Sequence, residues 1–257
     1  MRYHGGKWRM APWIISHFPD HKGYVEPYCG AASILLRKPR SFNEVINDLD
    51  DDVVSLFRVL RDPDKASELC RRIELTPFSR AEYNAACDVN TCDEVEAAAE
   101  LVIRSFMGFG SSGNRKYISG FRAASKQSGR PHALDWANVP ESLHAVTERL
   151  KGVVIENREA LKVISQQDSA ETLFYVDPPY LHSTRCSTNQ YTFEMTAMDH
   201  NALAKRLRGV KGKVVLSGYE SELYRELYAD WRVDKKEVMA SSNVGSVART
   251  EFLWMNF

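Results

Sequence analysis

The four residues Asp177-Pro178-Pro179-Tyr180 bring a carboxylate, two rigid residues and an aromatic ring together at one point of the chain. They directly follow the apolar run Thr172–Val176, which predicts a buried strand. Proline fixes its φ angle and has no backbone N–H, so this corner presents carbonyl and carboxylate acceptors beside a flat stacking face. That combination suits a planar heterocycle that carries an amino group. A simple strand-ending turn is the alternative interpretation.

The first two predicted strands also end in residues suited to a ligand. The first runs into Glu26-Pro27-Tyr28-Cys29-Gly30-Ala31-Ala32-Ser33, whose small residues would let a ligand approach the backbone. Packing of a helix on the sheet would explain the same residues. The second ends at Asp48, where an acid can accept hydrogen bonds from ribose hydroxyls or cap the next helix. Near the start, Tyr3 could stack on a flat ligand and Lys7 could meet a carboxylate.

The segment from Leu101 to Leu134 contains no Asp or Glu, although the whole chain has 34 basic and 34 acidic residues. Aromatic and glycine residues are interleaved with its basic ones, which are Arg104, Arg115, Lys116, Arg122, Lys126, Arg130 and His132. Lys and Arg displace the counterions of a polyanion, and aromatic rings stack or wedge. This pattern favours a nucleic-acid contact over a merely solvated loop.

The five cysteines are scattered without a C-x-x-C pair, which argues against a disulfide framework and a standard zinc site. We therefore expect a reducing cytosolic setting and no metal. Hydrophobic residues make up 44% of the chain, which is enough for a packed core. No apolar stretch approaches the roughly 18 residues that a membrane span needs.

Strands and helices are predicted to alternate at both ends of the sequence. The predicted strands are Gly23–Val25, Glu44–Asn47, Gly152–Ile155, Thr172–Val176 and Lys213–Leu216. Helices are predicted near 7–17, 31–37, 53–60, 140–150, 158–165, 196–208 and 220–228, with several more in 63–107 and a final hairpin from 231–240 and 249–257. This order predicts an α/β fold: a doubly wound sheet formed by residues 1–60 and 141–257, interrupted by a mostly helical insertion, residues 61–140.

Taken in order, these motifs resemble those of the Dam family of DNA adenine-N6 methyltransferases, which includes phage and prophage members. The matching stretches are His4–Lys7 (cofactor motif), Val25–Ser33 (glycine motif), Asn47-Asp48 (ribose-binding acid), Asp177–Tyr180 (catalytic motif), and Ser241–Asn243 with Arg249–Leu253 (C-terminal hairpin). Each motif is short, and their shared order along nearly the whole chain makes the resemblance specific.

The resemblance implies a Rossmann-like methyltransferase sheet, with the helical insertion as the DNA target-recognition domain. It implies S-adenosylmethionine as cofactor, S-adenosylhomocysteine as product and no metal. The implied cofactor contacts are Tyr3, Lys7, Asp48 and Asp177, with Glu26, Tyr28 and Gly30 lining the methionine end. The chain departs from the family pattern at Tyr3, where some relatives have Trp. The basic segment differs most from the family, so no DNA recognition sequence can be transferred from it.

By this resemblance, the chain is expected to methylate N6 of an adenine flipped out of duplex DNA. Tyr180 would stack on the base, while the Asp177 carboxylate and the Pro178 carbonyl each accept one amino hydrogen. The residues expected to contact phosphates or guanine edges are Arg115, Lys116, Arg122, Lys126 and Arg130.

The same residues leave other activities open. A cytosine-N4 methyltransferase, an RNA adenine methyltransferase and a DNA-binding regulator that has lost activity would share much of this pattern. The expected partner is double-stranded DNA, with no membrane. We expect a monomer, or a dimer on DNA, in the cytoplasm of a bacterial or phage-infected cell.

Overall fold

The computed structural model describes residues 6–88, 91–109, 113, 118–123, 131–184, 192–242 and 245–257. The chain divides into two compact units. A helical unit consists mainly of Asp50–Val153, and a sheet unit consists of Lys7–Leu49 with most of the chain from Val154 onward. Within the described ranges, no helix has the length and apolar character needed to cross a membrane.

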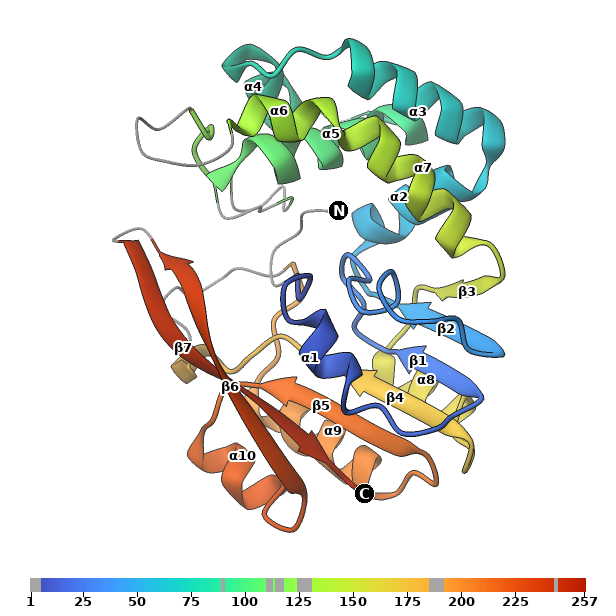
Figure 1. Ribbon diagram of the computed structural model, residues 1–257, viewed down its shortest axis with the longest axis vertical. Helices are drawn as coiled ribbons and strands as arrows, with labels where there is room; N and C mark the ends of the chain where they lie inside the picture. The colour runs from blue at the N-terminus through green and yellow to red at the C-terminus, as the bar shows by residue number, and fades with distance from the viewer. Residues whose placement is uncertain are drawn as a thin grey trace. The chain divides into compact units, whose positions relative to one another are not determined.

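The sheet unit is built on seven strands in the order β3-β2-β1-β4-β5-β7-β6 (Figure 1). Their bounds are β1 (Gly23–Glu26), β2 (Asn43–Asn47), β3 (Val153–Glu156), β4 (Thr172–Val176), β5 (Lys213–Gly218), β6 (Arg232–Ser242) and β7 (Gly245–Met255). Strand β1 pairs in parallel with both β2 and β4, and β4 pairs in parallel with β5. The strand order therefore reverses between β1 and β4, where open α/β sheets bind ligands at the carboxyl ends of their strands.

Both faces of the sheet are covered, as the continuous apolar strands predicted. On one face, Phe174 and Val176 of β4 pack in a core with residues of α8 (Ala160–Gln166), α9 (Ala197–Arg208) and α10 (Glu222–Leu227). On the other face, Phe18, which follows α1 (Ala11–Ile15), packs against Tyr24 and Tyr175. The predicted doubly wound α/β sheet is confirmed, although the helix expected over 7–17 is confined to α1.

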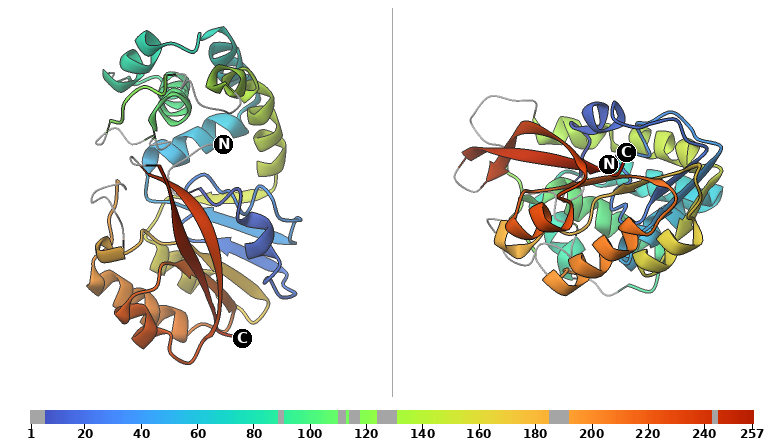
Figure 2. Two further views of the ribbon diagram at one scale, coloured as in Figure 1. Left: turned by 60° about the vertical axis from the view of Figure 1, so that its left-hand side comes forward. Right: turned by 90° about the horizontal axis from the view of Figure 1, so that it is seen from below.

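The C-terminal hairpin is confirmed and is longer than expected. Strands β6 and β7 pair along their whole length, from Arg232 opposite Met255 to Ser242 opposite Gly245. Only Phe252–Met255 of β7 also pairs with β5, in antiparallel register, so the rest of the hairpin extends beyond β5 (Figure 2). Because Phe252 lies opposite Gly218, the last residue of β5, Glu251 comes just past the carboxyl end of that strand.

The helical unit contains six described helices. They are α2 (Asp51–Arg61), α3 (Pro63–Leu75), α4 (Arg80–Asp88), α5 (Glu94–Met107), α6 (His132–Ala137) and α7 (Val139–Leu150). Aspartate side chains start three of them, because Asp50, Asp62 and Asp93 accept hydrogen bonds from backbone N–H groups of the first turn. Apolar side chains of α2 and α5 are buried within the unit.

The helix predicted at residues 31–37 is wrong, because this segment forms consecutive turns. Gly30 and Ala32 have φ angles of 45° and 51°, which lie outside the right-handed helical region. The Leu35 N–H donates to Glu26 Oε1 at 2.6 Å instead of to a backbone carbonyl one turn back. A tertiary hydrogen bond and a left-handed backbone therefore replace the expected helix.

We predict that Gly212→Ala destabilises the sheet unit by about 2 kcal/mol, the usual scale of overpacking. A Cβ at Gly212 would lie 2.7 Å from the carbonyl oxygen of Thr172 and 2.9 Å from the Phe174 ring. The glycine is held in place because its N–H donates to Asp168 at 3.0 Å and its carbonyl accepts from Asn256 at 3.1 Å. Urea denaturation measures the change.

Gly209→Ala is the matched control. The nearest atom to a Cβ there is the Arg206 carbonyl oxygen at 3.6 Å, an ordinary contact. Its free energy of unfolding should stay within about 0.5 kcal/mol of the parent chain. Equal stability of the two variants would contradict the tight approach of Gly212 to β4.

Candidate active site

An ion pair between a buried lysine and a partly buried aspartate lies where β4 ends at the carboxyl edge of the sheet. The Nζ atom of Lys7 lies 3.2 Å from Asp177 Oδ2, and the two side chains are 10% and 17% exposed. Lys7 Nζ also lies 4.7 Å from the centroid of the Tyr180 ring, within the range of a cation–π contact. Lys7 thus meets a carboxylate of the chain itself, the acid of the Asp-Pro-Pro-Tyr corner; its role toward a ligand stays a prediction.

The second oxygen of Asp177 is fixed by hydroxyl groups. Ser217 Oγ donates to Asp177 Oδ1 at 2.8 Å, and the Tyr180 hydroxyl approaches the same atom at 3.1 Å. The Tyr175 hydroxyl lies 3.1 Å from Ser217 Oγ, which extends this network back along β4 and β5. Hydroxyls on two neighbouring strands thus hold the carboxylate in one orientation.

Glu251 on β7 is a member of this site that was expected only as part of the hairpin motif Arg249–Leu253, with no role of its own. Its Oε1 atom accepts a short hydrogen bond from the Tyr180 hydroxyl and lies 3.6 Å from Lys7 Nζ. Burial is the main reason that its pKa is raised, Asp177 raises it further, and Lys7 opposes the shift. The available signal was a lone acid directly before the apolar run Phe252–Met255.

Asp48 lies against the glycine turn, at the end of β2. Its Oδ2 atom accepts the Gly30 N–H at 2.8 Å, and Gly30 has the positive φ of 45° that favours glycine. The neighbouring Asn47 side chain donates to the Pro27 carbonyl at 2.9 Å, which ties the ends of β1 and β2 together. The helix-cap alternative for Asp48 is not what the structure has, because Asp50 caps α2.

Glu26 and Tyr28 are turned toward the protein interior. Glu26 is 1% exposed, and its Oε1 accepts both the Leu35 N–H and the Tyr24 hydroxyl, each at 2.6 Å. Burial raises the pKa of Glu26 to about 7. Tyr28 packs against the core of the sheet unit, and burial raises its pKa as well. These contacts give both side chains a structural role, whatever they contribute to a ligand.

The Asp-Pro-Pro-Tyr corner itself is largely covered. Pro178 is buried and Pro179 is partly buried. Tyr180, expected to stack on a base, is 6% exposed, and its ring meets Tyr219 edge-on with centroids 4.7 Å apart. A flat ligand would therefore reach only a small part of the Tyr180 ring in this arrangement.

Four residues expected to bind DNA lie outside the described residues: Arg115, Lys116, Lys126 and Arg130. The predicted cofactor residue Tyr3 lies outside them as well. Arg122 is described and partly buried, and its N–H donates to the Met107 carbonyl. Arg104 is buried: its guanidinium donates to the carbonyls of Gly113 and Ala86 at 2.9 and 2.8 Å. Arg104 is thus a structural tie within the helical unit and adds nothing to a polyanion surface.

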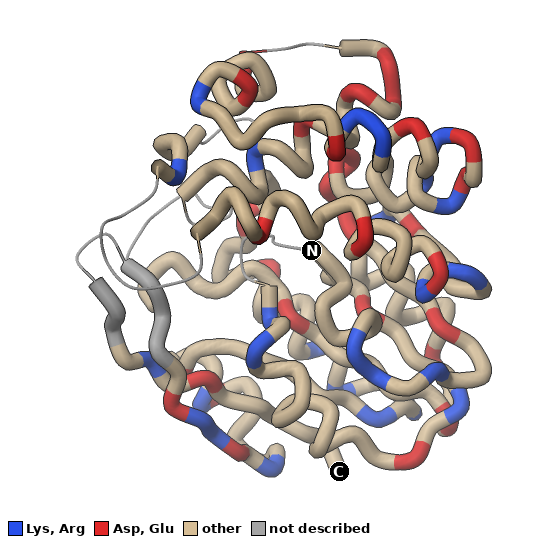
Figure 3. Tube along the Cα trace, turned by 45° about the horizontal axis from the view of Figure 1, so that its top comes forward, with Lys and Arg blue, Asp and Glu red and all other residues tan. Residues whose placement is uncertain are grey.

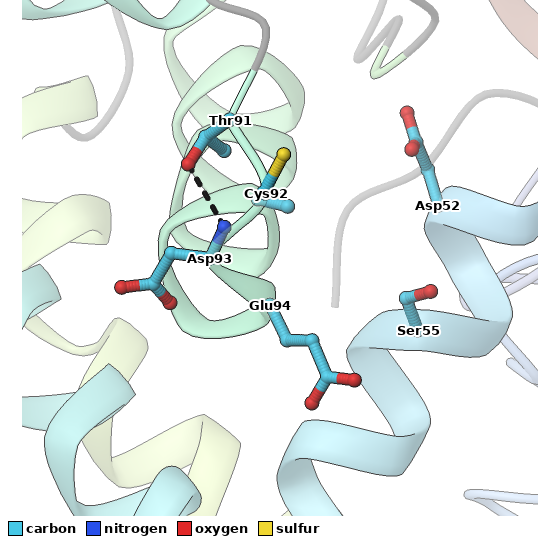
Figure 4. Close-up of a pocket in the computed structure, with 7 residues that line it drawn as sticks. Asp52, Ser55, Thr91, Cys92, Asp93 and Glu94 are labelled. Carbon is cyan, nitrogen blue, oxygen red and sulfur yellow. Dashed lines mark hydrogen bonds between the residues drawn. The ribbon is translucent and has the colours of Figure 1, made fainter.

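A separate hollow lies within the helical unit, between the start of α2 and the segment that leads into α5 (Figure 4). Its lining includes Asp52, Ser55 and Asp93 and none of the residues at the sheet edge. Asp93 is already engaged as the cap of α5. In the part of the chain that the structure describes, no group of three His, Cys, Asp or Glu side chains is placed to hold a metal ion.

Residues 3–241 match the family described as D12 class N6 adenine-specific DNA methyltransferase. The chain is 26% identical over 266 residues to a DNA adenine methylase of Salmonella typhimurium, covering 98% of this chain and 92% of that protein. It is 24% identical over 280 residues to the Type II methyltransferase M1.LlaDCHI of Lactococcus lactis subsp. cremoris, covering 100% of this chain and 94% of that protein. A solved SAM-dependent methyltransferase from Agrobacterium tumefaciens is similar over 97% of this chain and 61% of its own, at 11% identity and a TM-score of 0.39.

The raised pKa of Glu26 predicts a pH-dependent stability. An acid whose pKa is higher in the folded state stabilises that state at low pH, and the contribution is lost as pH rises through the folded pKa. A shift from 4.5 to about 7 corresponds to roughly 3 kcal/mol. Glu26→Gln keeps an acceptor for Leu35 and does not titrate. Its free energy of unfolding relative to the parent chain should therefore rise by roughly that amount from about pH 4 to about pH 8.

Urea denaturation at several pH values measures this difference. Glu237→Gln is the control, because Glu237 is an exposed glutamate on β6. It makes the same chemical change at the surface, for comparison with Glu26→Gln. A pH-independent difference for Glu26→Gln would show that burial does not raise the pKa of Glu26.

Proposed function

Because the chain belongs to the D12 class of N6 adenine-specific DNA methyltransferases, we propose that it transfers a methyl group from S-adenosylmethionine to the exocyclic N6 of an adenine flipped out of duplex DNA. The observation that carries this proposal is the Lys7–Asp177 pair at the end of β4. This ion pair lies where the strand order reverses, next to β1, and the chain after β1 leads into the turn at Gly30. We expect the protein to act in the cytoplasm, as a monomer or as a dimer on DNA.

The residues at the ends of β1 and β2 suit the adenosine half of the cofactor. A carboxylate has several acceptor sites, so Asp48 can hold the Gly30 N–H and a ribose hydroxyl at once. The left-handed Gly30 lets the ligand approach a backbone that has no Cβ. Lys7 and Asp177 would lie at the methionine half, and Tyr3 is proposed to stack on the adenine ring of the cofactor. When bound, S-adenosylmethionine supplies an electrophilic methyl group on a positively charged sulfur.

The target amine is a poor nucleophile, because its lone pair is delocalised into the adenine ring. We propose that the Asp177 carboxylate and the Pro178 carbonyl each accept a hydrogen bond from one of the two amino hydrogens. These two bonds would draw electron density onto the nitrogen and direct its lone pair at the methyl group. Tyr180 would contact the base, and Pro179 would keep the corner rigid. Placement and electrostatics then supply most of the catalysis.

The helical unit is proposed to read the DNA target. Figure 3 shows acidic and basic residues interspersed along the described helices, so no single helix stands out as a basic surface that would bind a polyanion. The acid-free segment 101–134 is therefore the part of this unit that we assign to DNA, with contacts from Arg115, Lys116, Arg122, Lys126 and Arg130. Flipping the adenine would cost a few kcal/mol of unpairing and unstacking.

We predict that Asp177→Ala abolishes methyl transfer while duplex binding stays within about threefold. The change removes the acceptor for the amine and leaves the helical unit untouched. Purified protein, plasmid DNA and S-adenosylmethionine are incubated, the DNA is digested to nucleosides, and these are separated and identified by mass spectrometry. The parent chain should yield N6-methyladenine, whereas N4-methylcytosine or no product would overturn the proposed function.

Asp20→Ala is the control for this experiment, because Asp20 is an exposed aspartate of the sheet unit. It should methylate at the parent rate. A parent-like rate for Asp177→Ala would remove Asp177 from the reaction, even if the product is N6-methyladenine.

We predict that replacing a phosphate-contacting member of the basic segment lowers the salt dependence of DNA binding by about one unit of slope. Arg115, Lys116, Arg122, Lys126 and Arg130 are each changed to Ala, and binding to one duplex is measured over a range of salt concentrations. Lys205→Ala, on the exposed face of α9, is the control and should leave the slope unchanged. An unchanged slope for all five variants would place DNA elsewhere.

A further inference from the structure

We propose that Glu251 is a positioning residue for methyl transfer, which keeps Asp177 a strong acceptor for the target amine by competing for donors that would otherwise weaken it. This inference rests on the proposed function and extends it to a residue on β7. Glu251 reaches the corner from the C-terminal hairpin, whereas Asp177 follows β4. The two acids share both Lys7 and Tyr180.

The Tyr180 hydroxyl is the first shared donor. It lies 3.1 Å from Asp177 Oδ1 and also donates to Glu251 Oε1. A phenol has a single O–H hydrogen, so it can donate fully to only one of the two carboxylates. Because Asp177 Oδ1 already accepts the Ser217 hydroxyl, we assign the Tyr180 hydrogen to Glu251. Asp177 Oδ1 then keeps the Ser217 hydroxyl as its stronger donor, at 2.8 Å.

The Lys7 ammonium is the second shared donor. It lies 3.2 Å from Asp177 Oδ2 and 3.6 Å from Glu251 Oε1, so its charge serves both acids. Without the charge on Glu251, Lys7 and the Tyr180 hydroxyl would both turn to Asp177. A carboxylate that already receives an ammonium and two hydroxyls is a weaker acceptor for the hydrogens of an amine.

The burial of Glu251 supports a role beyond packing. Its side chain is 3% exposed and precedes four apolar or aromatic residues of β7. An ionised carboxylate in such a place costs several kcal/mol unless a cation and donors meet it, and an apolar residue of similar size is often no less stable. The position thus carries a charge that the strand does not need for packing, and the charge is directed at the acid of the catalytic corner.

The test compares Glu251→Gln, Tyr180→Phe and the double variant at saturating DNA and cofactor. Glu251→Gln keeps the shape and an acceptor oxygen but removes the charge. We expect its kcat to fall roughly 10- to 100-fold, by analogy with the loss of partners that orient metal-ligating side chains. KM for DNA should stay within about threefold, because no DNA contact is removed. A kcat within twofold of the parent chain would overturn the proposal.

The double variant separates positioning from a general structural role. Tyr180→Phe removes the shared hydroxyl and keeps the ring. If Glu251 acts through that hydroxyl, the loss in the double variant is much smaller than the product of the two single losses. Multiplicative losses would mean that Glu251 does not act through Tyr180, and would overturn this mechanism.

Two controls make the outcomes distinct. Glu237→Gln, an exposed glutamate on the neighbouring strand, should keep the parent kcat. Urea denaturation of Glu251→Gln identifies any loss of folded protein, and kcat is expressed per folded molecule. If the parent chain produces no N6-methyladenine, the proposed function fails. If the parent chain is active and Glu251→Gln matches it, only the inference about Glu251 fails.

Discussion

One lysine ammonium held between the buried Glu251 and the partly buried Asp177 links three segments at this edge of the sheet. Lys7 lies 3.2 Å from Asp177 and 3.6 Å from Glu251, and the three residues come from the start, the middle and the end of the sequence. A buried carboxylate is tolerated only when a cation and hydrogen-bond donors meet it. Loss of Lys7 would leave both carboxylates without their cation, so the three segments are expected to order together.

The strand order explains why these three segments can meet. The reversal between β1 and β4 places the carboxyl ends of two adjacent parallel strands at one point, which is where Asp177 lies. Strand β7 then runs antiparallel next to β5, and its register brings Glu251 to the same edge. A strand that ran parallel to β5 in the place of β7 would bring its carboxyl end to this edge instead. The antiparallel strand thus adds a second acid to a site that parallel strands alone would leave with one.

The sequence predicted the sheet well and the site only in part. Parallel strands buried on both faces appear as short continuous apolar runs, as in Thr172–Val176, which a single sequence shows directly. Asp48, Asp177 and Lys7 could be found because each belongs to a local motif. The failed helix at 31–37 and the role of Glu251 depend on contacts between residues distant in sequence. Local patterns carry no information about such contacts. A single acid directly before an apolar strand, as at Glu251, nevertheless marks a position worth testing.

The acids of the corner also bear on how a charged ligand would be held. Glu26 and Glu251 both have a raised pKa, chiefly through burial, and Asp177 adds to the shift of each. Each acid is harder to ionise chiefly because it is buried and in part because Asp177 lies nearby, and a cation entering the corner would favour its charged form. The sulfur of the proposed methyl donor is positively charged, whereas the sulfur of the demethylated product is neutral. The same electrostatics would favour a positively charged group in this corner over a neutral one.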